Sequence, residues 1–475
     1  MRKQVSNNSS NSSIPPSRDF KPNNKSKSDK TAETTKSESA NEFNGRIKTS
    51  RKSGGQVGHD GHTLNKTKVQ ALLASENVVH QIIEHNKGPR VNKLSNCYCQ
   101  ETNFSNCVTS KRTSYKCVDP KTNDFQKEYV SKYVIDGAFQ GIIREHRFYK
   151  DENGEIVIPE KYRAHVQYGS ELKCFVAMLS GHGMVSSSRI RSLISEASKN
   201  VINLSDGTVY NFLSKFSNKS KKLIKDIENN LLNNEILQVD ETGMRCESKN
   251  MCIRNYSNNE SVLYTANSTK SKAAIIANNI LPLYVGIVIH DHNTVNYNYG
   301  TDHGECNVHG LRYLRANTEH TSNAWSQEMI EFLVNLNNKR KEKIQLGEKY
   351  FSDIELSEYS ERYNKILEKG FLSNEKTKSP VYKADEGRLL RRLKKYKNHH
   401  LLFAYNFDVP FDNNMSERDL RVAKVKQKVS GCFRSLLGAK RFANLLTIIK
   451  TAIRKKSSPY KTILNIFKKL NPTFA

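Results

Sequence analysis

The sequence lacks long apolar runs, and this absence limits where the protein can work. No window of the 475 residues approaches the roughly 18 apolar residues of a membrane-spanning helix. No apolar signal core follows the N-terminal Met-Arg-Lys. The nine cysteines are scattered along the chain, which argues against a disulfide framework and for reduced thiols. We therefore expect a soluble cytoplasmic protein without a membrane partner.

Acidic residues are also in short supply, because 76 Lys and Arg stand against 48 Asp and Glu. The formal net charge of +28 is an indication of partners rather than of fold. A polyanion is the natural partner of such a chain. Nucleic acid is the first candidate and a membrane surface the second.

The N-terminal third contains little apolar sequence. Residues 1–65 are rich in Ser, Asn, Lys and Gly, which predicts a disordered basic tail, either a solvated linker or an arm that touches phosphates. Residues 66–165 contain two short helical patterns and a segment that is similar to a degenerate zinc ribbon. Tetrahedral zinc needs two close cysteine pairs, and here Cys97 and Cys99 are separated by one residue with no clean second pair. Weak zinc binding by Cys97 and Cys99 and free thiols both stay open.

Residues 166–230 predict two short helices around the polar corner "NLSDG". The first helix has an apolar face made by Ile190, Leu193 and Ile194. Ser205 or Asp206 is positioned to cap the second. In a helix-turn-helix the start of the second helix reads DNA, which would place Thr208, Tyr210 and Asn211 at the bases. An ordinary helical hairpin is the alternative.

From residue 231 the sequence favours an α/β layer fold. "EILQVDETGMR" and "LYVGIVIHDH" have the length of buried strands, and "MCIRNYS" and "SVLYTAN" predict a hairpin across "NNE". "SKAAIIANNIL" predicts a helix. A charged, helical insertion is expected at about 320–400 within a core that spans 231–430, and a C-terminal helical region at 431–475.

Three acids suggest a metal site. Asp240 and Asp291 are each expected at the carboxyl end of a strand, where sites gather in open α/β sheets. Glu417 begins a basic helix. Three converging carboxylates suit Mg²⁺ or Mn²⁺. The bland alternatives are turn residues for the two Asp, and a capping box from Asn414 to Glu417.

Basic residues follow Glu417 at helical spacing: Arg418, Arg421, Lys424 and Lys428. They would hold DNA phosphates or form a solvated helix face. Separately, His303, Cys306 and His309 follow one another at intervals of three residues. They could be ligands of a soft metal ion, or packing and substrate-contact residues.

Several stretches together carry a family likeness, and the last is the most specific. They are "NNSSNSSIPPS" (7–17), "GGQVGHDGHTL" (54–64), "VQYGSELK" (166–173), "LSDGTVYNFL" (204–213), "ILQVDETGMR" (236–245), "IHDH" (289–292), "HGECNVHGLRYL" (303–314) and "VPFDNNMSERDLRVAKVKQKVSGCFRS" (409–435). With them the chain resembles transposases of the insertion-sequence-66 family.

The resemblance implies a ribonuclease-H-like core in which Asp240, Asp291 and Glu417 are the catalytic Asp-Asp-Glu set. It implies metal-dependent cleavage and strand transfer of an insertion sequence, with Mg²⁺ or Mn²⁺ as cofactor. The implied partners are the terminal inverted repeats and target DNA, further copies of the chain, and accessory proteins of the same element, at the bacterial nucleoid. A nuclease of the same fold and a non-catalytic or decayed DNA-binding protein are the rival hypotheses.

Overall fold

The computed structural model describes residues 167–470 continuously, with Leu73, short stretches between 143 and 162, and Phe474. All of these except Leu73 belong to one compact unit. The predicted N-terminal tail, Cys97 and Cys99 lie outside the described residues, so the zinc prediction stays untested.

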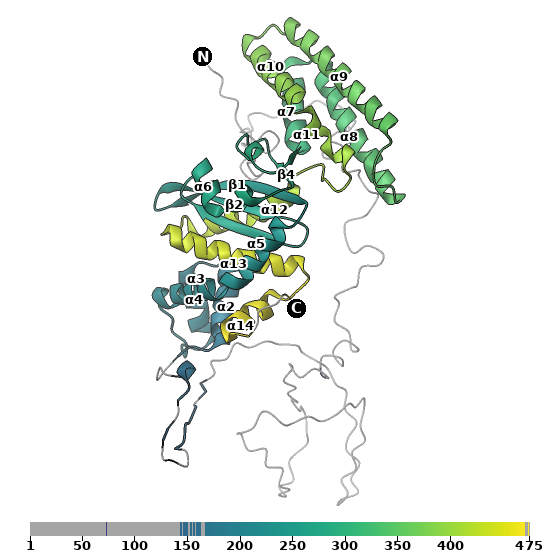
Figure 1. Cartoon of the computed structure of the whole chain (residues 1–475). Coiled ribbons are helices and arrows are strands. Elements are labelled where there is room, and N and C mark those ends of the chain that lie inside the picture. The colour runs from purple at the N-terminus through teal and green to yellow at the C-terminus, as the bar shows by residue number, and fades with distance from the viewer. Residues whose placement is uncertain are drawn as a thin grey trace, which may run out of the picture. The chain divides into compact units, whose positions relative to one another are not determined.

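A mixed five-stranded sheet forms the centre of the fold, in the order β3-β2-β1-β4-β5 (Figure 1). Its strands are β1 (Ile236–Cys246), β2 (Lys249–Ser257), β3 (Val262–Asn267), β4 (Ile287–His290) and β5 (Asp302–Glu305). β1, β2 and β3 form an antiparallel meander, while β4 pairs in parallel with both β1 and β5. The predicted α/β layer and the hairpin are thereby confirmed.

The first strand differs from the prediction in one respect. β1 does not end at Asp240, because it continues to Cys246 in register with β2. Only Ile236–Gln238 pair with β4, so the parallel ladder stops two residues before Asp240. Asp240 thus lies mid-strand, but just beyond the end of its parallel neighbour, and Asp291 follows the last residue of β4 as expected.

The helices have the following bounds, in chain order. They are α2 (Ser170–Gly181), α3 (Ser187–Ala197), α4 (Asp206–Lys219), α5 (Lys221–Leu232), α6 (Lys272–Asn278), α7 (Asn307–Thr321), α8 (Ala324–Gln345), α9 (Asp353–Lys376), α10 (Pro380–Lys395), α11 (Lys397–Tyr405), α12 (Asn414–Ser430), α13 (Leu436–Arg454) and α14 (Pro459–Lys468). Single 3-10 turns occupy Glu160–Tyr162, Leu281–Leu283 and Asn296–Asn298.

The side chains on the two faces of β1 pack against different helices. Leu237 and Val239 pack in a core with residues of α5, α13 and α14. Successive side chains of a strand point to opposite faces, so Asp240 lies on the other face. Met244 shares that face and packs against Leu420 and Ala423 of α12. The strand therefore presents Asp240 toward the side where α12 lies.

The region at 320–400 is helical, as predicted, and its apolar residues form one core with Ile289 of β4 and Leu311 of α7. α8, α9 and α10 pack around Trp325, Tyr363 and Leu390. At its centre Glu386 is fully buried and accepts hydrogen bonds from Trp325 Nε1 at 2.7 Å and Asn323 Nδ2 at 2.7 Å. These bonds lower the pKa of Glu386 although burial raises it. The helices are therefore a packed element joined to the sheet through α7 and α11.

The two helices predicted at 184–223 are present as α3 and α4. Ser205 caps α4, since its hydroxyl accepts from the Thr208 amide at 3.1 Å. Ile190 and Ile194 are buried as expected, whereas Leu193 is exposed, because the buried face of the short helix α3 is narrower than the apolar spacing suggested. Among the described residues, no helix is long and apolar enough to cross a membrane.

Candidate active site

The candidate site lies where β1 leaves its parallel partner. Asp240 pairs with Asn255 of β2. Asp291 directly follows the end of β4, which is the strand next to β1. The backbone amide of Glu241 donates to Asp240 Oδ1 at 2.7 Å and orients that carboxylate. Both Asp side chains are partly buried. The two acids, 51 positions apart in the sequence, are thereby neighbours on adjacent strands.

The start of α12 is fixed to the same place by side-chain hydrogen bonds. Asn413 is fully buried, and its Nδ2 donates to the Val239 carbonyl at 2.8 Å. Asn255, the cross-strand partner of Asp240, donates from Nδ2 to the Ser416 carbonyl at 3.2 Å. Glu417 is the next residue. These two bonds hold the first turn of α12 against β1 and β2 beside Asp240.

The position of the N-cap of α12 excludes a capping box from Asn414 to Glu417. The N-cap of α12 is Asn413, whose side chain makes no capping bond, and Asn414 is already inside the helix. The Asn414 amide instead donates to Asp412 Oδ1 at 2.9 Å. Glu417 therefore does not cap its own helix in the described structure.

Burial raises the pKa of each of the three acids. Burial raises the pKa of Asp240 well above its ordinary value, and the carboxylates of Asp291 and Glu417 raise it further. Burial raises the pKa of Asp291 to about 6, with the charges of Glu241 and Glu417 adding to the effect. The pKa of Glu417 is raised by burial although Arg312 and Arg421 oppose the shift. Like charges disfavour ionisation in this way when they lie within several ångströms of one another.

The neighbouring Glu241 provides an instructive contrast. Its carboxylate forms an ion pair with buried Arg254 and a second with Lys270 at 3.3 Å. Among residues 167–470, neither Asp240 nor Asp291 forms an ion pair with a basic side chain. Glu241 is thus a compensated acid, while the adjacent pair of Asp is not. Sequence reasoning passed over Glu241, because the acid beside it carried the motif.

The soft metal trio, one of the two alternatives for His303, Cys306 and His309, is not formed. Cys306 and His309 instead gather with Glu417, with one ligand atom of each within 4.8 Å of the others. His309 Nδ1 lies 3.6 Å from Glu417 Oε1. His303 stands on β5 and packs against the rings of His290, Tyr297 and His399. The trio is split because β5 ends at Glu305, so that His303 belongs to a strand and the other two to the start of α7.

The predicted cations lie on the exposed side of α12, and two of them act near Glu417. Arg418, Arg421, Lys424 and Lys428 are all exposed. The charges of Arg421 and Arg418 lower the pKa of Glu417. Lys424 Nζ donates to the Gly243 carbonyl, so this side chain also ties α12 to β1. The stripe is therefore a basic surface next to the acids.

Of the residues predicted to read DNA, two are available at the surface. Tyr210 and Asn211 are exposed on α4, and Arg441 lies over the Tyr210 ring with its guanidinium carbon 4.2 Å from the ring centre. Thr208 is half-buried, with its hydroxyl 3.0 Å from that of Ser205. The geometry leaves both the helix-turn-helix and the plain hairpin open.

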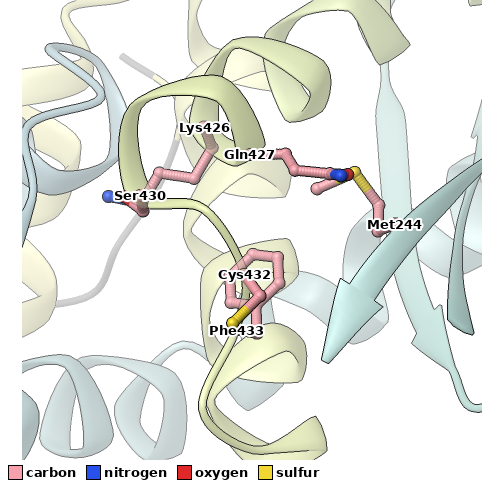
Figure 2. A pocket seen from close by; sticks show the side chains of 6 residues that line it. All are labelled: Met244, Lys426, Gln427, Ser430, Cys432 and Phe433. Atoms are coloured by element: carbon pink, nitrogen blue, oxygen red, sulfur yellow. The ribbon is translucent and has the colours of Figure 1, made fainter. Parts of the chain in front are cut away.

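A small cavity opens beside the C-terminal end of α12, away from the acids (Figure 2). It is lined by Met244, Lys426, Gln427, Ser430, Cys432 and Phe433, and its volume is about 30 Å³. Such a space holds no more than about two water molecules. A polymeric substrate would therefore meet the acids at the surface rather than in this cavity.

Comparison with known proteins decides the family. The sequence model of the Transposase IS66 family matches residues 165–441, which include β1, β4 and α12 with their three acids. The chain belongs to the IS66 family of transposases. As a member, it has a role in the transposition of an insertion sequence, a form of DNA recombination, and DNA binding follows from that role. No curated protein matches the chain.

One group in this IS66-family chain was not foreseen from its sequence. His292, Glu305 and His400 are buried together beside the end of β4. Burial lowers the pKa of His400 to about 3 and keeps its ring neutral. His292 next to Asp291 was visible as a signal in "HDH", but Glu305 and His400 come from β5 and α11 and have no shared sequence motif.

Proposed function

We propose that the chain cleaves DNA at the ends of its insertion sequence and joins them to target DNA, with Asp240, Asp291 and Glu417 as ligands of Mg²⁺ or Mn²⁺. The observation that carries the proposal is the docking of α12. Asn413 bonds to the residue before Asp240, and Asn255 bonds to the residue before Glu417. Two distant parts of the sequence are thus held together next to the two acids.

The donor set fits a hard divalent cation. Among the described residues neither Asp forms an ion pair, although the charge of Lys270 lowers the pKa of Asp291, and Glu417 Oε1 is a buried acceptor without a hydrogen-bond donor. Carboxylate oxygens are the ligands that Mg²⁺ and Mn²⁺ prefer. When bound, such ions would neutralise the carboxylates and stabilise the charge that develops on a phosphate during in-line displacement.

The chain's own residues would bind and orient the substrate. Arg418 and Arg421, beside Glu417, would hold the phosphates of the strand that is cut, and Lys424 and Lys428 would extend this contact along α12. Hydrolysis of a phosphodiester frees a 3′ hydroxyl, and the attack of that hydroxyl on target DNA joins the strands. This sequence needs no covalent bond to the protein, and hence no nucleophilic side chain.

The fold supports the same reading. Three antiparallel strands followed by two strands parallel to the first favour a ribonuclease-H-like core at 231–430, with α8, α9 and α10 as its helical insertion. We infer that 166–230 is the DNA-reading region, through Tyr210 and Asn211 on α4, and that 431–475 completes the core as helices. A multimer on paired DNA ends, accessory proteins of the element and a place at the nucleoid belong to the same proposal.

The test is cleavage of DNA that carries the element's ends. Asp240→Asn is expected to abolish Mg²⁺-dependent cleavage and to leave binding to the same DNA intact. Glu241→Gln is unsuitable as a silent control because of its ion pairs. Lys365→Ala on α9 serves instead, because the ion pair of Lys365 among the described residues is with exposed Glu361. Undiminished cleavage by the Asp240→Asn protein would remove Asp240 from the mechanism.

The rival hypotheses give different results in the same system. A nuclease of this fold would cut the ends but yield no joined product when offered pre-cut ends and target DNA. A protein without catalysis would bind DNA with a steep salt dependence and cleave under no metal condition. Strand transfer from pre-cut ends therefore separates the three.

A further inference from the structure

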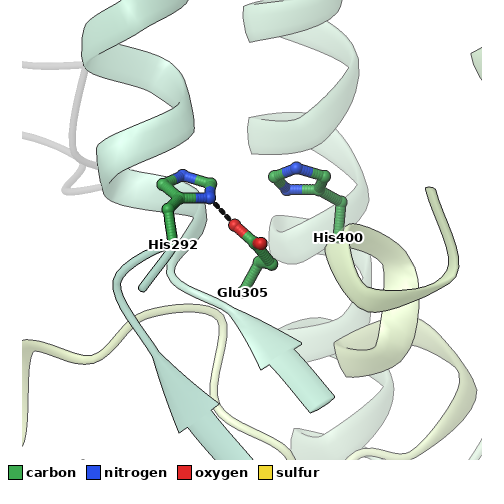
Figure 3. A group of neighbouring side chains, drawn as sticks. All are labelled: His292, Glu305 and His400. Carbon is green, nitrogen blue, oxygen red and sulfur yellow. Dashed lines mark ion pairs between the residues drawn. The ribbon is translucent and has the colours of Figure 1, made fainter. Parts of the chain in front are cut away.

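A second set of metal-ligating side chains lies beside the end of β4, distinct from the three acids. His292 follows Asp291, Glu305 ends β5, and His400 is in α11. One ligand atom of each lies within 4.8 Å of the other two. Figure 3 shows the Glu305 carboxylate between the two imidazole rings. The side chains of His292 and Glu305 are 5% and 0% exposed, and His400 as a residue is 1% exposed.

Several buried polar atoms of this group make no hydrogen bond among the described residues. Both ring nitrogens of His292, Oε2 of Glu305 and Nε2 of His400 are buried without one among the described residues. His292 Nδ1 and Glu305 Oε2 approach each other closely, as the dashed line in Figure 3 marks. Buried polar atoms in folded proteins are almost always satisfied, so the two atoms left with neither a hydrogen bond nor an ion pair among the described residues, His292 Nε2 and His400 Nε2, need an explanation.

The hydrogen bonds around His400 point its free nitrogen into the group. Asn307 Nδ2 donates to the His400 carbonyl at 3.0 Å, which leaves Asn307 Oδ1 to face the ring. His400 Nδ1 lies 3.2 Å from that oxygen and must donate to it. In a neutral imidazole the other nitrogen, Nε2, then carries a lone pair. A metal-ligating histidine is oriented by its second nitrogen in this same way.

Glu305 is divided between two environments. Its Oε1 accepts from the Tyr297 hydroxyl and lies 3.6 Å from Arg392 Nη2. Its Oε2 faces the histidines. Arg392 also donates to the His292 carbonyl at 3.1 Å, which fixes the backbone of that residue. His292 has φ 60, a left-handed conformation that a non-glycine residue adopts at a cost.

We propose that His292, Glu305 and His400 form a binding site for a divalent transition ion, with zinc as the most suitable. Two imidazoles and a carboxylate are a donor set that zinc accepts and magnesium does not favour. Ligand atoms about 2.0–2.2 Å from a tetrahedral zinc ion lie about 3.3 Å from one another. An ion would therefore enter between His292 Nδ1 and Glu305 Oε2, whose close approach must open, while His400 lies within 4.8 Å of both. Burial of all three side chains keeps a DNA strand away from the ion, so we infer a role in holding the fold together. The site would fasten α11 to the ends of β4 and β5 and so fix the residue next to Asp291.

The experiment counts zinc in the full-length protein after chelator treatment, reloading with zinc and dialysis. The wild-type protein is expected to retain one more zinc per chain than His400→Gln or Glu305→Gln. His399→Gln is the matched control. His399 is next to His400 in α11, but its ring contacts the His303 carbonyl of β5 and the ring of Tyr297 instead. It should retain the wild-type number, and so should Asp240→Asn, because the site does not depend on the three acids. Any zinc held by cysteine is unchanged by these substitutions and cancels in the difference.

Equal zinc in wild-type, His400→Gln and Glu305→Gln would overturn the proposal and leave His292 and Glu305 as a simple ion pair. Glu305→Gln keeps the shape of the side chain and decides the matter if His400→Gln does not fold by circular dichroism. X-ray absorption of the zinc-loaded wild-type protein decides it without any variant. Nitrogen and oxygen ligands near about 2.0 Å with imidazole scattering support the site, whereas sulfur ligands alone near about 2.3 Å contradict it.

Discussion

Removing one of the uncompensated acids should stabilise the metal-free protein, although the same change should destroy activity. Burial and neighbouring carboxylates raise the pKa of Asp291 from its ordinary value of 3.8 to about 6. A shift of that size corresponds to about 3 kcal/mol between the charged and neutral forms. Because Asp240 and Glu417 share the penalty, Asp291→Asn should recover about 1–3 kcal/mol at pH 8.

The sign of the pH dependence follows from proton counts. Between about pH 4 and pH 6 the folded protein holds a proton on Asp291 that the unfolded chain has released, so stability falls as the pH rises through this window. Above it the full penalty is present. The variant lacks this decline, so its advantage should be absent near pH 4 and complete at pH 8.

Scanning calorimetry in EDTA at several pH values measures the effect. A gain of 1 kcal/mol raises the Tm of a domain of 150–250 residues by about 2–4 °C, and of a larger unit by less, so a rise of a few degrees is expected at pH 8. Added Mg²⁺ should stabilise the wild-type protein and have little effect on the variant. Glu241→Gln is the matched control of opposite sign, because it breaks the ion pairs with Arg254 and Lys270 and should lower the Tm. A fall in Tm for Asp291→Asn at pH 8 would refute the reasoning.

The remaining predictions concern α12. Lys426 is buried, its Nζ donates to the Val185 carbonyl at 2.9 Å, and burial lowers its pKa to about 8. Between about pH 8 and 10.5 the unfolded chain therefore holds more protons than the folded protein, so this group adds stability as the pH rises. Lys426→Met should lose that gain, which Tm scans at pH 8 and 10 measure. A pH dependence of the Tm equal to that of the wild-type protein would contradict this prediction. Lys428→Ala should weaken binding to all DNA sequences alike and reduce the slope of log affinity against log salt by about 1, whereas Lys365→Ala should leave the slope unchanged. A Lys428→Ala slope equal to wild type, measured by fluorescence anisotropy, would make α12 a solvated face.

The sequence predicted the elements better than their ends. The hairpin of β2 and β3 followed from alternation around a polar turn, and Ser205 was placed correctly as a cap because capping is a local interaction. The end of β1 was wrong, because an acid after an apolar run looks like a strand end unless one knows that β2 continues to pair with it. Strand pairing is a non-local interaction, so a short stretch of sequence does not predict where it ends.

The candidate site shows the same limit. Asp240, Asp291 and Glu417 could be named from motifs, but the bonds that join their elements come from Asn255 and Asn413, which sequence alone gives no reason to choose. Of the two alternatives for His303, Cys306 and His309, the metal trio is not formed, because the boundary between β5 and α7 separates His303 from the other two residues. His292, Glu305 and His400 could not be found at all, since their meeting depends on how α11 packs against the sheet.

The central claim is that three distant carboxylates share divalent ions, and Mn²⁺ binding followed by electron paramagnetic resonance tests it most directly. Asp240→Asn, Asp291→Asn and Glu417→Gln should each weaken Mn²⁺ binding, and the Asp240→Asn/Glu417→Gln double variant should lose less than the sum of its single changes, because both residues serve the same ions. Wild-type Mn²⁺ affinity in the Glu417→Gln protein, or losses that simply add in the double variant, would show that α12 does not contribute to a common site.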